Sequence, residues 1–123
     1  MHETFSDCIL MDYCNVRLNK SRRLRDKFPG YYPIIIVPSN ESIIDKTKFL
    51  VNGEYTFSKF LCIIRNHMHI KESSGVFITI EGKMPILTDS IENSFKSYAR
   101  SDEYLYISLH TENTFGAKYP QNY

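Results

Sequence analysis

The histidines and cysteines are the residues best suited to chemistry here, and their spacing matches no recognised catalytic or metal-binding set. His67 and His69 stand two positions apart, on opposite sides of an expected helix, and no cysteine or carboxylate lies at ligand spacing from them. Cys62 sits beside apolar neighbours within that helix, which predicts a buried, unreactive thiol. The nucleotide-binding and nucleophile motifs GxGxxG, Walker A and GxSxG are absent from the sequence. We therefore expect no metal site, no cofactor and no enzyme activity.

The end of the chain is a second place where chemistry could occur. Residues 104–110 alternate, with Leu105, Ile107 and Leu109 on one face, which is the period of a half-buried strand. Nothing apolar and periodic follows. If this strand lies in the middle of a sheet, residues 111–123 project into water, either as an unstructured end or as a segment presented to a partner. Composition alone favours the unstructured end.

Length and composition limit the classes of protein that fit. A chain of 123 residues with 42% hydrophobic residues is suited to one domain with one core. The net charge of +1 predicts neither a nucleic acid nor a membrane surface as partner. Three cysteines, an odd number without CxxC spacing, favour a reducing cytosol over a disulfide scaffold. No apolar run reaches the ~18 residues of a membrane span.

The first part of the chain is expected to contain one short helix. Residues 1–16 hold neither period for long, which suggests an adaptable arm. Residues 17–27 carry six basic side chains against one acidic, with Ser21 as a candidate N-cap. This basic helix should end before Pro29, because proline disfavours helical geometry in the residue that precedes it.

The remaining pattern predicts strands at 31–37, 48–51, 75–80 and 104–110, with a brief return strand at 84–87. A central helix should follow the N-cap Thr56, with one apolar stripe made of Phe57, Phe60, Leu61, Ile64 and Met68. A second helix should open at Asp89, paired with Glu92 as in a capping box, and should turn its apolar side chains inward, namely Ile91, Phe95 and Tyr98. One helix across one mixed sheet, with a late strand in the middle, is the β-grasp arrangement of an α+β protein. A ferredoxin-like split βαβ is the alternative.

Several short motifs follow one another along the chain: Lys48-Phe-Leu-Val51, Phe60 with Ile64-Arg65, Gly75-Val-Phe-Ile78, Pro85, Asp102-Glu-Tyr-Leu-Tyr-Ile107 and Glu112-Asn-Thr-Phe-Gly116. Together they resemble the autophagy ubiquitin-like modifiers, the GABARAP and microtubule-associated-protein light-chain family, from about residue 21 to 116. The resemblance implies a ubiquitin-like β-grasp with an N-terminal helical extension. It divides the chain into an arm and basic helix at 1–27, the β-grasp domain at 28–116, and a tail at 117–123 that processing removes.

The resemblance also implies a chemical role for the tail. A cysteine protease would cut between Gly116 and Ala117, with Phe115 beside the scissile bond. Activating and conjugating enzymes would then transfer Gly116 to phosphatidylethanolamine, with Arg65 and Phe115 in contact with the processing or activating enzymes. Because glycine has no Cβ, its acyl carbon stays open to attack by a thiol or an amine. The protein would thus be a substrate, cytoplasmic at first and on the autophagosome membrane after lipidation.

The family binds receptor segments that carry an aromatic residue, two variable positions and an aliphatic residue, added as a strand beside Lys48 to Leu50. The positions that match the aromatic pocket are Leu24, Pro33, Ile35, Lys48, Leu50 and Tyr104. Those that match the aliphatic pocket are Ile36, Phe49, Val51, Tyr55, Phe60 and Ile63. Lys46 and Lys48 would attract acidic residues beside the motif. The chain departs from the family at Tyr31, Thr47 and Asn52, where arginine, lysine and proline are usual. These departures affect the part of receptor preference that depends on charge. For Ile35, Ile36, Phe60 and Ile63, plain core packing is the competing interpretation.

Two other functions stay open from the sequence. A β-grasp interaction module that is never conjugated, or that binds microtubules, would need no tail processing. A basic α+β domain that binds nucleic acid would depend on Arg22, Arg23 and Arg25, although no aromatic RNA-binding signature accompanies them.

Overall fold

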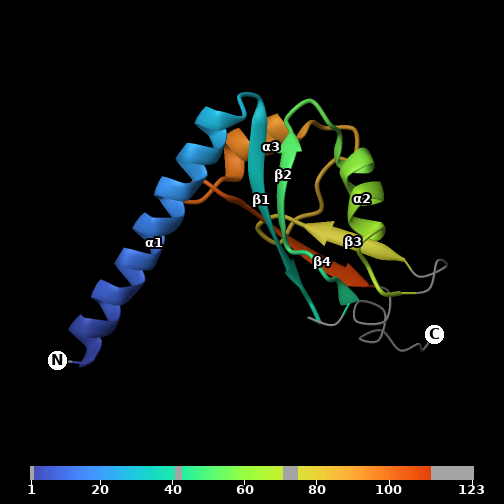
Figure 1. Ribbon diagram of the computed structural model, residues 1–123. Coiled ribbons are helices and arrows are strands. Elements are labelled where there is room, and N and C mark those ends of the chain that lie inside the picture. Colours follow the sequence, from blue (N-terminus) through green and yellow to red (C-terminus); the bar gives the residue numbers. More distant parts are fainter. Residues whose placement is uncertain (1, 41–42, 71–74, 112–123) are drawn as a thin grey trace.

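The computed structural model describes residues 2–40, 43–70 and 75–111, with side chains from Asn15 onward. It contains three helices and four strands within these residues (Figure 1). In chain order they are α1 (His2–Lys27), β1 (Tyr31–Pro38), β2 (Lys48–Asn52), α2 (Phe57–Arg65), β3 (Val76–Thr79), α3 (Ile91–Tyr98) and β4 (Leu105–Thr111). No helix among the described residues is both long and apolar enough to cross a membrane.

The four strands form one mixed sheet in the order β2-β1-β4-β3. β1 pairs with β4 in parallel, starting at Ile34–Leu105, while β1–β2 and β3–β4 are antiparallel. The last strand therefore lies inside the sheet, as predicted, and β2 and β3 are the edges. This order confirms the β-grasp and rules out the ferredoxin-like alternative.

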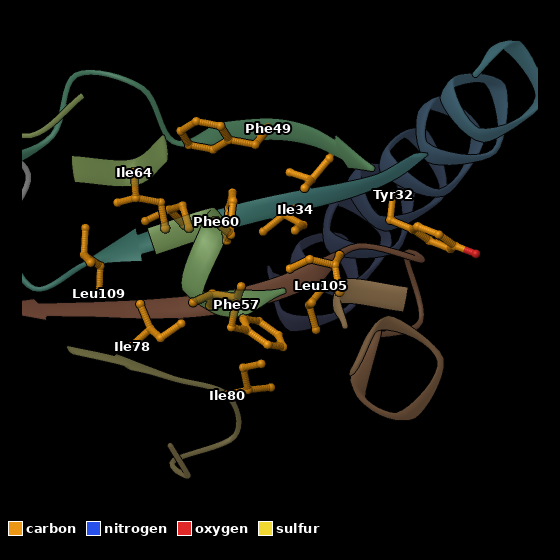
Figure 2. Close-up of a cluster of buried hydrophobic side chains, with 14 of the residues drawn as sticks. Tyr32, Ile34, Phe49, Phe57, Phe60, Ile64, Ile78, Ile80, Leu105 and Leu109 are labelled. Carbon is orange, nitrogen blue, oxygen red and sulfur yellow. The ribbon is translucent and has the colours of Figure 1, made fainter. Parts of the chain in front are cut away.

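The core fills one face of this sheet, as Figure 2 shows around Phe57, Phe60 and Ile64 of α2. Leu105, Ile107 and Leu109 of β4 have no exposed surface, which confirms the predicted alternation. The side-chain oxygen of Thr56 accepts a hydrogen bond from the Lys59 N–H (3.2 Å), so the predicted N-cap of α2 is also confirmed. Burial of this apolar face is the main stabilising contribution to the fold.

Pro33 lies inside a central strand, where a missing N–H would normally be costly. Ile36 donates to Thr47 (2.7 Å), so the even-numbered residues of β1 direct their N–H groups toward β2. The Pro33 nitrogen therefore faces β4, where pairing begins only at the next residue, Ile34. The proline thus occupies a position where the ladder requires no donor.

The N-terminal prediction was wrong. α1 is continuous from His2, and its first turns extend away from the sheet in Figure 1. Ser21 is therefore an interior helical residue, fully buried, and its hydroxyl donates to the Glu103 carbonyl. Local periodicity is a poor guide here because the first turns of the helix lie away from the sheet.

Three other local predictions need correction. The return strand at 84–87 does not form: residues 80 and 83 make an isolated bridge, and the Leu87 carbonyl accepts instead from the Ser58 N–H at the start of α2 (3.0 Å). The cap of α3 is Ser90, one residue later than predicted, since its hydroxyl accepts from the Asn93 N–H (3.2 Å). Tyr98 ends that helix and is exposed.

Cys62 is exposed, which contradicts the predicted buried thiol. Phe57, Phe60 and Ile64 define the side of α2 that faces the core. At 100° per residue, position 62 points to the opposite side of the helix. Apolar neighbours in the sequence are therefore not neighbours in space.

Candidate functional site

The edge strand β2 has a row of backbone groups directed away from the sheet. The pairs Thr47–Ile36 and Gly53–Gly30 are joined by hydrogen bonds of 2.7 and 2.9 Å. In an antiparallel ladder such pairs alternate with pairs that share no hydrogen bond. Lys48 and Leu50, which stand opposite Ile35 and Pro33, belong to pairs of the second kind. Their N–H and C=O groups therefore point outward from the sheet. An extended peptide could pair with β2 at these two residues.

The predicted pocket residues lie on the two faces of this edge. On the outer face, Ile35 stands opposite Lys48, and Pro33 opposite Leu50. Ile35 and Leu50 are half-buried, whereas Lys48 is exposed. The other two members of the predicted aromatic pocket are Leu24 of α1, half-buried, and Tyr104, buried next to β4.

On the inner face, the predicted aliphatic-pocket residues belong mainly to the core. Ile36, Phe49, Val51 and Phe60 are buried, and the rings of Phe49 and Phe60 meet edge to face at 5.6 Å. Tyr55 and Ile63 are half-buried against the same cluster. The surface available to a ligand on this side comes from Tyr55 and Ile63, and the four buried residues support it from beneath.

Positive charge gathers at the start of β2. The Lys46 ammonium lies 4.9 Å from the Phe49 ring centroid, and the His67 ring meets the same ring edge-on at 5.5 Å. Lys46 and Lys48 are both exposed, so both can meet an acidic ligand. Arg65, the predicted enzyme contact, is half-buried at the end of α2.

The loop before β2 brings one carboxylate between two imidazoles. Asp45 Oδ1 lies 3.4 Å from His67 Nδ1, and Asp45 Oδ2 lies 3.5 Å from His69 Nε2. The sequence interpretation missed this cluster because it placed His67 and His69 in the central helix, whereas α2 ends at Arg65. Asp45 is distant in sequence, and the Ile44–Met68 bridge brings the two segments together. Among the described residues, no group of histidine, cysteine and acidic side chains is arranged to hold a metal ion.

A second polar cluster joins α1 to the start of β4. Asp102 accepts from Arg17 Nε (2.9 Å) and from the Tyr106 hydroxyl (2.6 Å). Burial and this hydrogen bond raise the pKa of Tyr106 to about 12. Glu103 pairs with Arg22 and Arg25 at 3.2 and 3.5 Å. Three of the six basic residues in 17–27 are therefore engaged with the domain itself, a contact that the sequence did not reveal.

The residues predicted for conjugation and cleavage, Phe115, Gly116 and Ala117, lie outside the described residues. β4 ends at Thr111, beside Val76 of the edge strand β3. Thr111, the last described residue, is five positions before Gly116 in the sequence.

The parallel β1–β4 pair at the centre, α2 across one face and an open β2 edge define a ubiquitin-like β-grasp protein. A family model described as "Autophagy protein Atg8 ubiquitin like" matches residues 16–116. The chain belongs to this family of ubiquitin-like autophagy proteins.

Individual relatives agree with this assignment. The chain is 31% identical to autophagy-related protein 8 of Schizosaccharomyces pombe, over 85% of this chain and 88% of the relative. It is 30% identical to autophagy-related protein 8e of Arabidopsis thaliana, over 82% and 85% of the two chains.

Two solved structures show the same fold. The Trypanosoma brucei ATG8 structure superposes with a TM-score of 0.73 at 22% identity, covering 80% of this chain and 88% of that chain. Plasmodium falciparum Atg8, solved in complex with an Atg3 peptide, gives 0.69 at 23% identity, covering 78% and 88%.

Proposed function

We propose that this protein is a modifier conjugated through Gly116 to phosphatidylethanolamine on autophagosomal membranes, after a cysteine protease has removed residues 117–123. The observation that carries the proposal is the extent of the family match, which ends at residue 116, within a tail that follows an interior strand. An interior strand gives the tail a fixed point of exit. The unmodified protein would be cytoplasmic.

In cleavage, activation and lipid transfer, this protein would be the substrate, and the catalytic groups would belong to other proteins. The protease hydrolyses the Gly116–Ala117 peptide bond. The activating enzyme then converts the freed carboxylate and ATP into an acyl adenylate with release of pyrophosphate, and a cysteine thiol displaces AMP to give the thioester. The amine of phosphatidylethanolamine attacks the thioester carbonyl, and the thiolate leaves as the amide forms. Two acyl chains then anchor the protein stably without a membrane span. We propose Arg65 and Phe115 as contacts for the processing or activating enzymes.

A conjugating enzyme is a proposed partner on the strength of one likeness. Plasmodium falciparum Atg8, which shares the fold, was solved with an Atg3 peptide. We infer that a conjugating enzyme engages this chain as well.

Autophagy receptors are the second class of proposed partner. A receptor segment with an aromatic-x-x-aliphatic motif would pair with Lys48 and Leu50 at the β2 edge. Its two side chains would contact the outer-face and inner-face sets named above, and Lys46 and Lys48 would meet acidic residues beside the motif. Backbone pairing would give affinity and the two pockets specificity.

The conjugation proposal is tested by Gly116→Ala in cells. The variant should give no faster-migrating, membrane-bound form, because the added methyl group crowds the acyl carbon. A matched chain that ends at Gly116 should be conjugated even where the processing protease is absent. A membrane-bound, faster-migrating Gly116→Ala protein would contradict the proposal.

The receptor proposal is tested by Leu50→Pro. Proline removes an N–H that faces away from β1, so it should abolish binding of a motif peptide while leaving the β1–β2 ladder intact. The unfolding midpoint of the variant checks that the ladder persists. Undiminished peptide binding would place the receptor elsewhere.

An interaction module that keeps its tail is the alternative, because the β2 edge can bind a peptide without conjugation. Mass spectrometry of the protein from its source cells separates the two, since an intact Tyr123 as the sole species supports the alternative.

A microtubule contact through α1 is a further proposal, because Lys20, Arg23 and Lys27 are exposed on this helix. Cosedimentation with microtubules, compared with a variant in which these three residues are replaced by Gln, tests that contact.

A further inference from the structure

Asp45, His67 and His69, which we call the histidine clamp, join the loop before β2 to the segment after α2. The Asp45 N–H donates to the His67 carbonyl (3.1 Å), and the His69 N–H donates to the Ile43 carbonyl (2.8 Å). These two backbone bonds join the segments, and the Asp45 carboxylate lies 3.4 Å from the His67 ring and 3.5 Å from the His69 ring. The backbone pairing therefore brings the three side chains to one place on the surface.

The clamp is in contact with solvent. The side chains of Asp45, His67 and His69 are 54%, 35% and 62% exposed. Protons can therefore reach both imidazoles without any opening of the fold.

The clamp is also continuous with the β2 edge. The His67 ring packs against Phe49, and the Lys46 ammonium lies over that same ring. Phe49 is flanked in β2 by Lys48, whose backbone faces the open edge. A ligand paired with this edge therefore lies beside a surface that holds Asp45, Lys46, Lys48 and the two imidazoles.

Protonation changes the charge of this surface. With neutral imidazoles, the carboxylate and the two lysines carry a net charge of +1, and with both imidazoles protonated the net charge is +3. Histidine is the side chain that ordinarily titrates between pH 5 and 8. Asp45 belongs to the clamp, the Lys46 ammonium lies over the Phe49 ring that His67 contacts, and Arg65 stands two residues before His67.

We propose that the histidine clamp is a proton-dependent recognition site for acidic residues of a peptide bound at the β2 edge. Protonation adds two positive charges to this surface, and these offset the repulsion that Asp45 exerts on an acidic ligand. A ligand that prefers the protonated surface must in turn bind more tightly as pH falls. This inference rests on the proposed receptor-binding role of β2 and adds to it a dependence on pH and on ligand charge.

The test measures the Kd of the full chain for a synthetic peptide with three Asp residues followed by Trp-x-x-Leu, from pH 8.0 to 5.5. Exposed charges separated by several ångströms interact weakly in water, so we expect binding about 3- to 10-fold tighter at pH 5.5. A peptide with Asn in place of Asp should show a flat profile. His67→Gln with His69→Gln should reduce the change to less than about twofold.

A matched control is His110→Gln, which removes the imidazole that contacts Thr79 on the β3–β4 pair (3.3 Å). It should keep the full pH dependence. Equal Kd at both pH values, or a dependence retained by the double variant, would overturn the clamp proposal. Failure of the peptide to bind at any pH would instead overturn the receptor role of β2.

Discussion

Arg17 and Asp102 lie 85 positions apart in the chain, and the Arg17 Nε donates to Asp102 Oδ2 at 2.9 Å. The Asp102 side chain is only 4% exposed. It also accepts from the Tyr106 hydroxyl (2.6 Å) and the Tyr104 N–H (3.1 Å). One carboxylate therefore joins α1 to the start of β4.

Asp102→Asn should destabilise the protein by about 2–3 kcal/mol, because it removes the charge that compensates Arg17 and weakens two hydrogen bonds. Urea unfolding measures the loss. The matched control is Glu92→Gln, which breaks the exposed Glu92–Lys96 pair (2.9 Å) on α3. The control should leave the unfolding midpoint almost unchanged. Equal shifts of the midpoint in the two variants would show that Asp102 contributes no more to stability than an exposed ion pair does.

The phenol of Tyr106 should affect stability at alkaline pH. Its pKa is raised to about 12 in the folded protein, chiefly by burial and then by Asp102. The unfolded phenol ionises near its ordinary pKa of about 10. A folded pKa above the unfolded one contributes stability that is complete below pH 10 and is lost as pH rises through 12.

Tyr106→Phe should therefore flatten the decline of the free energy of unfolding between pH 10 and 12, measured by urea titrations at fixed pH. Tyr98→Phe, which removes an exposed phenol at the end of α3, serves as the control. A decline that is unchanged in Tyr106→Phe would contradict the assignment of this effect to Tyr106.

Gly53→Ala should be destabilising for a steric reason. A Cβ at this position would lie 2.5 Å from Tyr32 Cε1 and 3.0 Å from Glu92 Cβ. The backbone cannot retreat easily, because the Gly53 N–H donates to Gly30 and its carbonyl accepts from the Glu92 N–H, both at 2.9 Å. We expect a loss of about 1–3 kcal/mol in thermal or urea unfolding. Tyr32→Leu should cost less in the Gly53→Ala background than in the wild type, and strict additivity would disprove the clash.

Phe60→Ala should remove about 3–5 kcal/mol, because the ring has no exposed surface and packs against Phe49. Cys62→Ala, two residues along the same helix, should be nearly neutral, since this side chain is exposed. Urea unfolding of both variants tests the orientation of α2. A larger loss for Cys62→Ala than for Phe60→Ala would mean that the helix is rotated.

Local pattern was sufficient for the elements that pack along their whole length. The apolar positions of β4, the N-cap of α2 and its buried residues Phe57, Phe60 and Ile64 could be read from the sequence, because strand and helix periods directly fix which side chains share a face. The predicted stripe was too long, since Leu61 is half-buried and Met68 lies beyond the end of α2. The same logic was wrong for residues 1–16, whose helix has no predicted core face, and for 84–87, where the loop packs on the start of α2. It also misplaced the α3 cap by one residue, since Asp89 and Ser90 are both good capping residues.

The sequence by itself determined the family, the β-grasp class and the alternation that assigns the candidate pocket residues to two faces of β2. Only the tertiary structure decided which backbone groups point outward from the β2 edge and which polar side chains meet. Arg17 with Asp102 and Asp45 with His67 are pairs of that kind. Periodicity specifies the face on which a side chain lies, but the docking of α1 and the bridge between Ile44 and Met68 specify its partner.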